Sequence, residues 1–178
     1  TLVRGSSGWV AHNTDSPGLQ LAMRDFGVEP KGTALIIGGG GAASAALDAL
    51  KQLGFLRIDV AVRRPAAARH LAASAVLPLD TLAEHIGTYQ CVVHATPCGL
   101  PLQPVAPLDV TRLSRDALLI DLVYRRDAKG TELTRAAQQH GLRACDGRAM
   151  LVHQAAVAQH LWLGHRAPIA NMMAALDD

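Results

Sequence analysis

Four consecutive glycines, Gly38 to Gly41, separate a short apolar run from an alanine-rich segment. Together they fit the pattern strand–G-x-G-x-x-A–helix, in which the first glycine permits a tight turn and the next lets the backbone approach a pyrophosphate. Ala43 is small enough for the helix to pack closely on the strand, and the helix N-terminus would offer free N–H groups to phosphates. The pattern predicts a dinucleotide-binding loop made of Gly38, Gly39, Gly40, Gly41 and Ala42.

Two arginines, Arg63 and Arg64, follow the second expected strand, where an NAD site usually carries an acid that binds the ribose hydroxyls. A carboxylate would repel a 2′-phosphate, whereas a guanidinium group can bind it in fork geometry. We therefore predict NADP as the cofactor, with Arg69 a weaker candidate contact. An acid at this position would have favoured S-adenosylmethionine, and the arginines argue against that ligand.

The elements that must position these residues alternate between strands and helices. We expect strands at 33–37, 58–62, 76–79, 91–95, 118–123 and 143–145, and helices at 42–53, 66–74, 82–86 and 131–140. Such alternation predicts an α/β fold of Rossmann type, with a doubly wound parallel sheet.

Different patterns flank this alternation at both ends. Residues 3–11 read as a strand or hairpin, and Thr14 or Asp15 is expected to cap a helix at 17–26. Two C-terminal helices are expected at 150–163 and 169–176. We divide the chain into a linking strand and helix (1–30), an NADP-binding domain (31–148) and a C-terminal helical segment (149–178).

Composition excludes several other classes of protein. The net charge of +2 and the 3% of aromatic residues argue against nucleic-acid binding. The apolar runs are too short to span a membrane. The histidines lack metal-ligand spacing, so we expect no metal site. Three cysteines without a CxxC pair predict reduced thiols in a cytoplasmic protein.

Several separated segments together resemble the shikimate dehydrogenase family. The segments are Asn13-Thr14-Asp15 with Gly18, the glycine loop, Asp121 to Tyr124, and Asp146 to Ala156, which resembles DGxxMLVxQAA. They occur in the family's order and span nearly the whole chain. The resemblance implies an NADP-dependent oxidoreductase that reduces 3-dehydroshikimate to shikimate in aromatic amino acid biosynthesis.

The resemblance also implies roles for individual residues. Asp15 matches an aspartate that pairs with a catalytic lysine, Gln154 matches a glutamine that contacts the substrate, and Tyr124 matches a tyrosine in the cleft. On the cofactor side the matching positions are Thr96, Val123, Gly147 and Met150. From the residues alone, Asp15 is better explained as a helix N-cap than as a catalytic residue, and only the resemblance reverses that order. The alternative explanations of Gln154 and Tyr124 are an exposed helix position and a half-buried strand end.

Some positions depart from the family pattern. The family's first lobe carries the lysine, and none of Lys31, Lys51 and Lys129 matches it, so we expect a fragment that is inactive alone. His94 stands where the family has asparagine, either as an acid–base group or as a packed side chain. These departures leave two alternatives open, a quinate/shikimate-type paralogue and a non-catalytic NADP-binding module.

The sequence also predicts binding partners. Beyond a shikimate-like hydroxy acid, we expect a homodimer, because the C-terminal helices carry apolar residues such as Leu161 and Trp162 that would be exposed.

Overall fold

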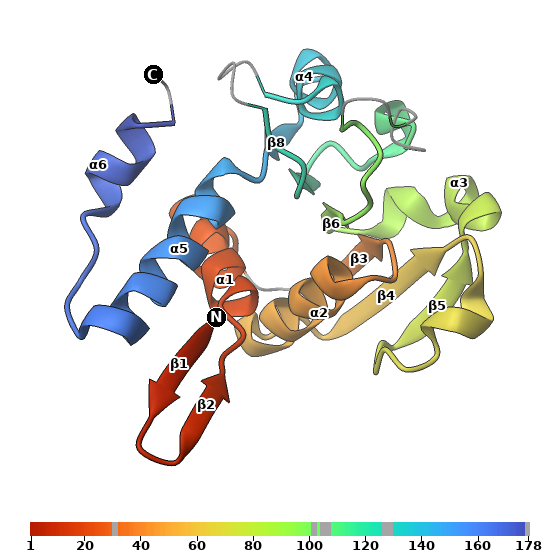
Figure 1. The fold of residues 1–178 in the computed structure, drawn as a ribbon. Coiled ribbons are helices and arrows are strands. Elements are labelled where there is room, and N and C mark those ends of the chain that lie inside the picture. Colours follow the sequence, from red (N-terminus) through yellow and green to blue (C-terminus); the bar gives the residue numbers. More distant parts are fainter. Residues whose placement is uncertain (30–31, 101–102, 104–107, 126–129, 177–178) are drawn as a thin grey trace.

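A six-stranded parallel sheet forms the centre of the computed structural model, which describes residues 1–29, 32–100, 103, 108–125 and 130–176 (Figure 1). Its strands are β3 (Thr33–Ile37), β4 (Arg57–Val62), β5 (Ala75–Pro78), β6 (Cys91–His94), β7 (Leu118–Asp121) and β8 (Arg143–Cys145). They lie in the order β5-β4-β3-β6-β7-β8. The chain therefore winds outward from β3 in one direction and then from β6 in the other, which confirms the doubly wound fold.

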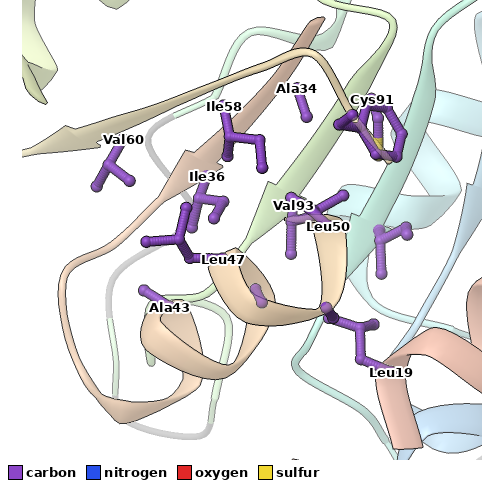
Figure 2. Close-up of a cluster of buried hydrophobic side chains, with 14 of the residues drawn as sticks. Leu19, Ala34, Ile36, Ala43, Leu47, Leu50, Ile58, Val60, Cys91 and Val93 are labelled. Atoms are coloured by element: carbon purple, nitrogen blue, oxygen red, sulfur yellow. The ribbon is translucent and has the colours of Figure 1, made fainter. Parts of the chain in front are cut away.

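Helices cover both faces of the sheet because β3 and β6 are apolar on both sides. Helix α2 (Gly41–Leu53) packs on one face together with α1 (Asp15–Asp25), and Figure 2 shows Leu47 and Leu50 of α2 against Ile36 and Val93 of the strands. The other face packs against α3 (Leu82–His85) and α4 (Glu132–Gln139). Each face has its own apolar cluster, so the carboxyl ends of the central strands are held from both sides.

The first segment is a hairpin followed by a helix, as the sequence predicted. Strands β1 (Leu2–Gly5) and β2 (Gly8–Ala11) pair antiparallel, and α1 follows. Thr14 is the N-cap residue of α1, one of the two predicted, but its side chain makes no capping bond, and Asn13 Oδ1 accepts the backbone N–H groups of Asp15 and Ser16 at 3.0 and 3.3 Å. The Thr14 hydroxyl contacts Gln154 instead, and Asp15 is exposed.

The helix expected at 66–74 is also wrong. The chain makes only a 3₁₀ turn at Pro65–Ala68, with further short 3₁₀ turns at Leu79–Thr81, Ile86–Thr88 and Val110–Arg112. Ser74 explains the difference, because its N–H donates to the Ile58 carbonyl at 2.7 Å and its Oγ accepts the Ile58 N–H at 3.1 Å. These two bonds to β4 hold the chain extended, and β5 begins at the next residue.

The chain closes with α5 (Arg148–Leu163), which ends at Gly164 in a left-handed conformation, and with α6 (Ile169–Ala174). Helix α5 lies beside α1 at one side of the sheet (Figure 1). Across the described ranges, no helix has the length and apolar character that crossing a membrane requires.

Candidate dinucleotide site

The candidate site lies at the carboxyl ends of β3 and β6, where the strand order reverses. Gly38 follows β3 with a φ of 127°, a conformation that L side chains rarely adopt. A Cβ atom at this position would lie 2.6 Å from the Ala95 carbonyl oxygen, and the Gly38 N–H donates to the Ala61 carbonyl at 3.0 Å. Gly38 therefore lets the loop turn within the space between β4 and β6.

The N-terminus of α2 is open to a ligand. Gly40 is its N-cap, and no side chain accepts the N–H groups of the first turn. Gly40 and Gly41 are exposed, and among the described residues, chain neighbours and the backbone of α2 aside, no heavy atom lies within 4 Å of where their Cβ atoms would be. Anions are stabilised by such free N–H groups and by the positive end of the helix dipole.

Arg63 and Arg64 lie on the same pocket as the glycine loop. This pocket, of about 280 Å³, is lined by Gly39, Gly40, Val62, Arg63, Arg64, Ala67 and Ala68. Both arginines are exposed, whereas Arg69 is not among the lining residues. Two guanidinium groups and a helix N-terminus thus face one volume, which suits a ligand with more than one phosphate.

A second pocket, of about 370 Å³, continues from the loop toward β6 and β7. Its lining includes Gly40, Gly41, Ala42, Thr96, Val123 and Tyr124. Because Gly40 lines both pockets, they form adjoining parts of one groove across the loop. The predicted cofactor residues that line one or both of these pockets are Gly39, Gly40, Gly41, Ala42, Arg63, Arg64, Thr96 and Val123.

Gly147 and Met150 lie behind this groove rather than in its described lining. The Gly147 N–H donates to the Val123 carbonyl at 3.0 Å, and a Cβ atom at Gly147 would overlap the Leu122 carbonyl oxygen. Met150 is partly buried against the apolar cluster under α2. Gly147, the N-cap of α5, therefore holds the backbone at Val123 in place.

Two of the residues predicted for the substrate side, Asp15 and Gln154, lie in segments that meet where α1 approaches α5, whereas Tyr124 lies elsewhere. The Thr14 hydroxyl donates to Gln154 Oε1 at 3.4 Å, which places the Asn13-Thr14-Asp15 segment against Gln154. In the part of the chain that the structure describes, no group bonds to the Asp15 carboxylate. Lys51, the lysine among those described residues, donates a hydrogen bond to the Ala72 carbonyl instead. Tyr124 is 41% exposed and belongs to the second pocket, so its hydroxyl is accessible.

His94 belongs to a buried polar network that sequence reasoning missed. Its side chain is fully buried, with Nδ1 at 2.8 Å from Asp121 Oδ1 and Nε2 at 2.6 Å from the Thr96 hydroxyl. Asp121 Oδ2 accepts the Thr131 hydroxyl at 2.6 Å. The signal in the sequence was a polar residue at the end of each of two neighbouring strands, but only their pairing shows that the two side chains meet.

Fold and loop together define this chain as a Rossmann-type dinucleotide-binding domain. Residues 147–176 match the family model described as "Shikimate 5'-dehydrogenase C-terminal domain". The chain is 38% identical to the shikimate dehydrogenase (NADP(+)) of Rubrobacter xylanophilus and 37% identical to that of Anaeromyxobacter sp. strain K. The alignments cover 92% and 99% of this chain. The chain belongs to the shikimate dehydrogenase family, and it spans 61% and 65% of the length of these two relatives.

Solved structures agree with this assignment. A shikimate 5-dehydrogenase from Thermus thermophilus, in complex with NADP(H) and shikimate, superimposes with a TM-score of 0.85 at 31% identity, covering 98% of this chain and 66% of that one. A quinate dehydrogenase from Corynebacterium glutamicum, in complex with NAD, gives a TM-score of 0.86 at 29% identity, covering 97% and 65%.

Proposed function

We propose that this chain binds NADP(H) and serves as the dinucleotide-binding part of an oxidoreductase that interconverts 3-dehydroshikimate and shikimate. The observation that carries the proposal is the pocket that the glycine loop shares with Arg63 and Arg64. The names of the curated relatives and the ligands of the Thermus thermophilus structure support the same cofactor and substrate.

The groove assigns parts of the cofactor to parts of the chain. Gly38 to Ala42 would hold the pyrophosphate at the N-terminus of α2, and Arg63 and Arg64 would bind the 2′-phosphate. Thr96 and Val123, which line the second pocket, would lie on the nicotinamide side, and Gly147 and Met150 would act there through Val123 rather than from the lining. When bound, the cofactor supplies a hydride donor or acceptor for the substrate carbon.

The substrate side would be formed by Asp15, Gln154 and Tyr124. Asp15 lies at the positive end of the α1 dipole, where a carboxylate is stabilised and can orient a protonated partner. Gln154 can donate and accept hydrogen bonds at once, which suits a hydroxylated acid. Tyr124 would reach the same substrate from the second pocket.

The cofactor proposal predicts a selective loss of affinity. We expect Arg63→Ala with Arg64→Ala to weaken NADPH binding about 10-fold to 100-fold, which corresponds to a net loss of about 1.5–3 kcal/mol, the worth of one charge-assisted hydrogen bond. NADH lacks the 2′-phosphate, so its weaker binding should change little. Isothermal titration calorimetry with both cofactors measures the difference.

Arg69→Ala is the matched control, because Arg69 is also exposed but lies outside the pocket lining. Equal losses for NADPH and NADH in the double variant, or an equal loss in the control, would contradict the assignment of the arginines.

The likeness to a quinate dehydrogenase favours a second candidate substrate. Quinate and shikimate share a carboxylate and vicinal hydroxyls, so the same Gln154 and Tyr124 contacts would serve either. Initial rates with each substrate, measured on the protein as its gene encodes it, decide between them by the ratio of kcat/KM values.

We further propose that the protein acts in the cytoplasm, in aromatic amino acid biosynthesis. Three free cysteines, Cys91, Cys98 and Cys145, support a reducing compartment, and the names of the relatives support the pathway. Cell fractionation followed by immunoblotting tests the location, and growth of a deletion strain without aromatic amino acids tests the pathway.

We also propose that two copies of the chain associate through the hairpin and the end of α5. Trp162 Nε1 donates to the Leu2 carbonyl at 2.9 Å, which joins these elements, and Trp9, Trp162 and Leu163 are 68%, 60% and 58% exposed. Large exposed apolar patches mark interaction sites. We expect the mass measured by light scattering to rise from monomer toward dimer with concentration.

Trp9→Ser should reduce this association. Leu56→Ser is its control, because Leu56 is 86% exposed in the turn between α2 and β4. A monomer at every concentration would show that this face is free or is covered by another partner.

A further inference from the structure

A buried chain of hydrogen bonds runs from β7 through His94 to the second pocket. His94 and Asp121 are register partners at the ends of β6 and β7, and both side chains are almost completely buried. Thr96 lies two residues beyond His94 and lines the pocket. Of the three hydrogen-bonded side chains of His94, Asp121 and Thr96, the one that lines the pocket and can contact a ligand there is Thr96.

The Asp121 carboxylate accepts hydrogen bonds on both of its oxygens. The Val123 backbone N–H donates to Oδ1 at 3.1 Å, and a backbone N–H can only donate. The Thr131 hydroxyl donates to Oδ2 at 2.6 Å, since Thr131 Oγ1 itself accepts the Thr134 N–H at 3.1 Å. The remaining contact, from Oδ1 to His94 Nδ1, is therefore satisfied when Nδ1 carries the proton.

The opposite side of the ring then meets Thr96. In the tautomer that carries its proton on Nδ1, Nε2 has a lone pair. The Thr96 hydroxyl, at 2.6 Å, donates to that lone pair. Thr96 Oγ1 also accepts the Cys98 N–H at 3.2 Å, which leaves its second lone pair for the pocket.

We infer that His94 is a positioning residue, held by Asp121, that fixes the Thr96 hydroxyl so that it presents only an acceptor to the nicotinamide-side pocket. The ligand group it selects is a hydrogen-bond donor, a ribose hydroxyl or a carboxamide N–H of the dinucleotide. This inference rests on the proposed function for the identity of the ligand, but its chemistry is set by the protein alone. An asparagine in place of His94 could present either end of its amide, so it would not fix the hydroxyl in the same way.

The tautomer of His94 tests the inference without a cofactor. In ¹⁵N NMR spectra of the imidazole nitrogens, a nitrogen without a proton resonates far downfield of a protonated one. We expect His94 to show a protonated Nδ1 and an unprotonated Nε2 at neutral pH, with the signals assigned by their loss in His94→Asn. A protonated Nε2, in either the other tautomer or the imidazolium, would overturn the inference.

Cofactor binding provides the second test, with NADPH as the probe. We expect Thr96→Val to weaken binding about threefold to tenfold, the loss of one neutral hydrogen bond, and Thr96→Ser to stay within about twofold of the unaltered protein. In NADPH-bound protein, the ¹⁵N spectrum should keep the same tautomer of His94.

The outcomes separate the inference from the proposed function. If the unaltered protein fails to bind NADPH, the proposed function is wrong, whereas the tautomer still decides the inference. If the protein binds NADPH and a folded Thr96→Val variant binds it equally well, the inference is wrong. Circular dichroism establishes that the variant is folded, and the tautomer measurement on unaltered protein decides the matter if it is not.

Discussion

The three cysteines differ in how deeply the fold buries them. Burial raises the pKa of the Cys91 thiol on β6 to about 12, and burial together with nearby Asp146 raises the pKa of the Cys145 thiol on β8 to about 12. Cys98 lies in the turn after β6 and is partly exposed. Since the thiolate is the reactive form, the two strand cysteines should be inert in the folded protein.

At pH 8 a thiol with a pKa of about 12 is a thiolate in roughly one molecule in ten thousand. We therefore expect iodoacetamide to label Cys98 in the native protein and to leave Cys91 and Cys145 unmodified, as measured by peptide mass spectrometry. Raising the pH to 10 increases the thiolate fractions of Cys91 and Cys145 about 100-fold, so any slow labelling of these two should accelerate.

Cys98→Ser should abolish the native labelling, and urea should expose the other two thiols. Labelling of Cys91 at the rate of Cys98 would mean that β6 opens readily in solution.

The sequence predicted those site residues whose neighbours along the chain define their role. Gly38 could be recognised because its strand and helix adjoin it, and Arg63 because it ends a strand of the same unit. The contact between His94 and Asp121 could not be predicted in the same way, because it forms only when β6 and β7 pair in their observed register. The bonds from the Asn13 side chain to the start of α1 were likewise missed, since three adjacent residues can all accept N–H groups there and only geometry selects among them.

At the scale of elements, the strands were easier to predict than the helices that connect them. β3 is an uninterrupted apolar run between turn residues, so its bounds agree with the prediction. The alanine-rich segment after β4 has high helix propensity, but its Ser74 bonds to β4 override that preference. Tertiary bonds of this kind have no local pattern in the sequence.

Helices α1 and α5 lie close together at Gly18. A Cβ atom there would lie 2.6 Å from Gln154 Cβ and 2.7 Å from its backbone nitrogen. Because backbone atoms cannot move aside cheaply, we expect Gly18→Ala to lower the free energy of unfolding by about 1–3 kcal/mol despite the better helix propensity of alanine. Urea denaturation measures the change.

Gly41→Ala is the control for stability, since no heavy atom lies within 4 Å of the added methyl group. It should be neutral or slightly stabilising. A Gly18→Ala variant as stable as the unaltered chain would show that α1 can shift away from α5 without loss.

At the scale of the whole molecule, the described residues that would bind the cofactor form a more complete set than those that would exchange a proton with the substrate. The groove contains a phosphate-binding loop and two arginines, whereas the Asp15 carboxylate has no cation beside it among the described residues. Proton exchange with a substrate hydroxyl needs a positioned acid–base partner. We therefore expect this polypeptide to bind the cofactor without supplying a complete catalytic pair.

We expect this polypeptide alone to bind NADPH and to form no NADPH from NADP⁺ and shikimate, as followed by absorbance. The binding measurement on the same sample establishes that it is folded. Formation of NADPH that depends on added shikimate would refute the expectation, and it would turn attention to another acid–base group within the chain.

The long sequence separation between α1 and its partner helix α5 matters during synthesis on the ribosome. Its bonds to α5, Asp25 with His153 at 2.7 Å and Thr14 with Gln154 at 3.4 Å, join residues 128 and 140 positions apart. At about 5–20 residues per second, the nascent helix waits roughly 6 to 25 s before its partner is translated. During that time its α5-facing surface is open to chaperones and to neighbouring nascent chains, so the order of translation, rather than the final stability, sets when this protein is most prone to aggregate.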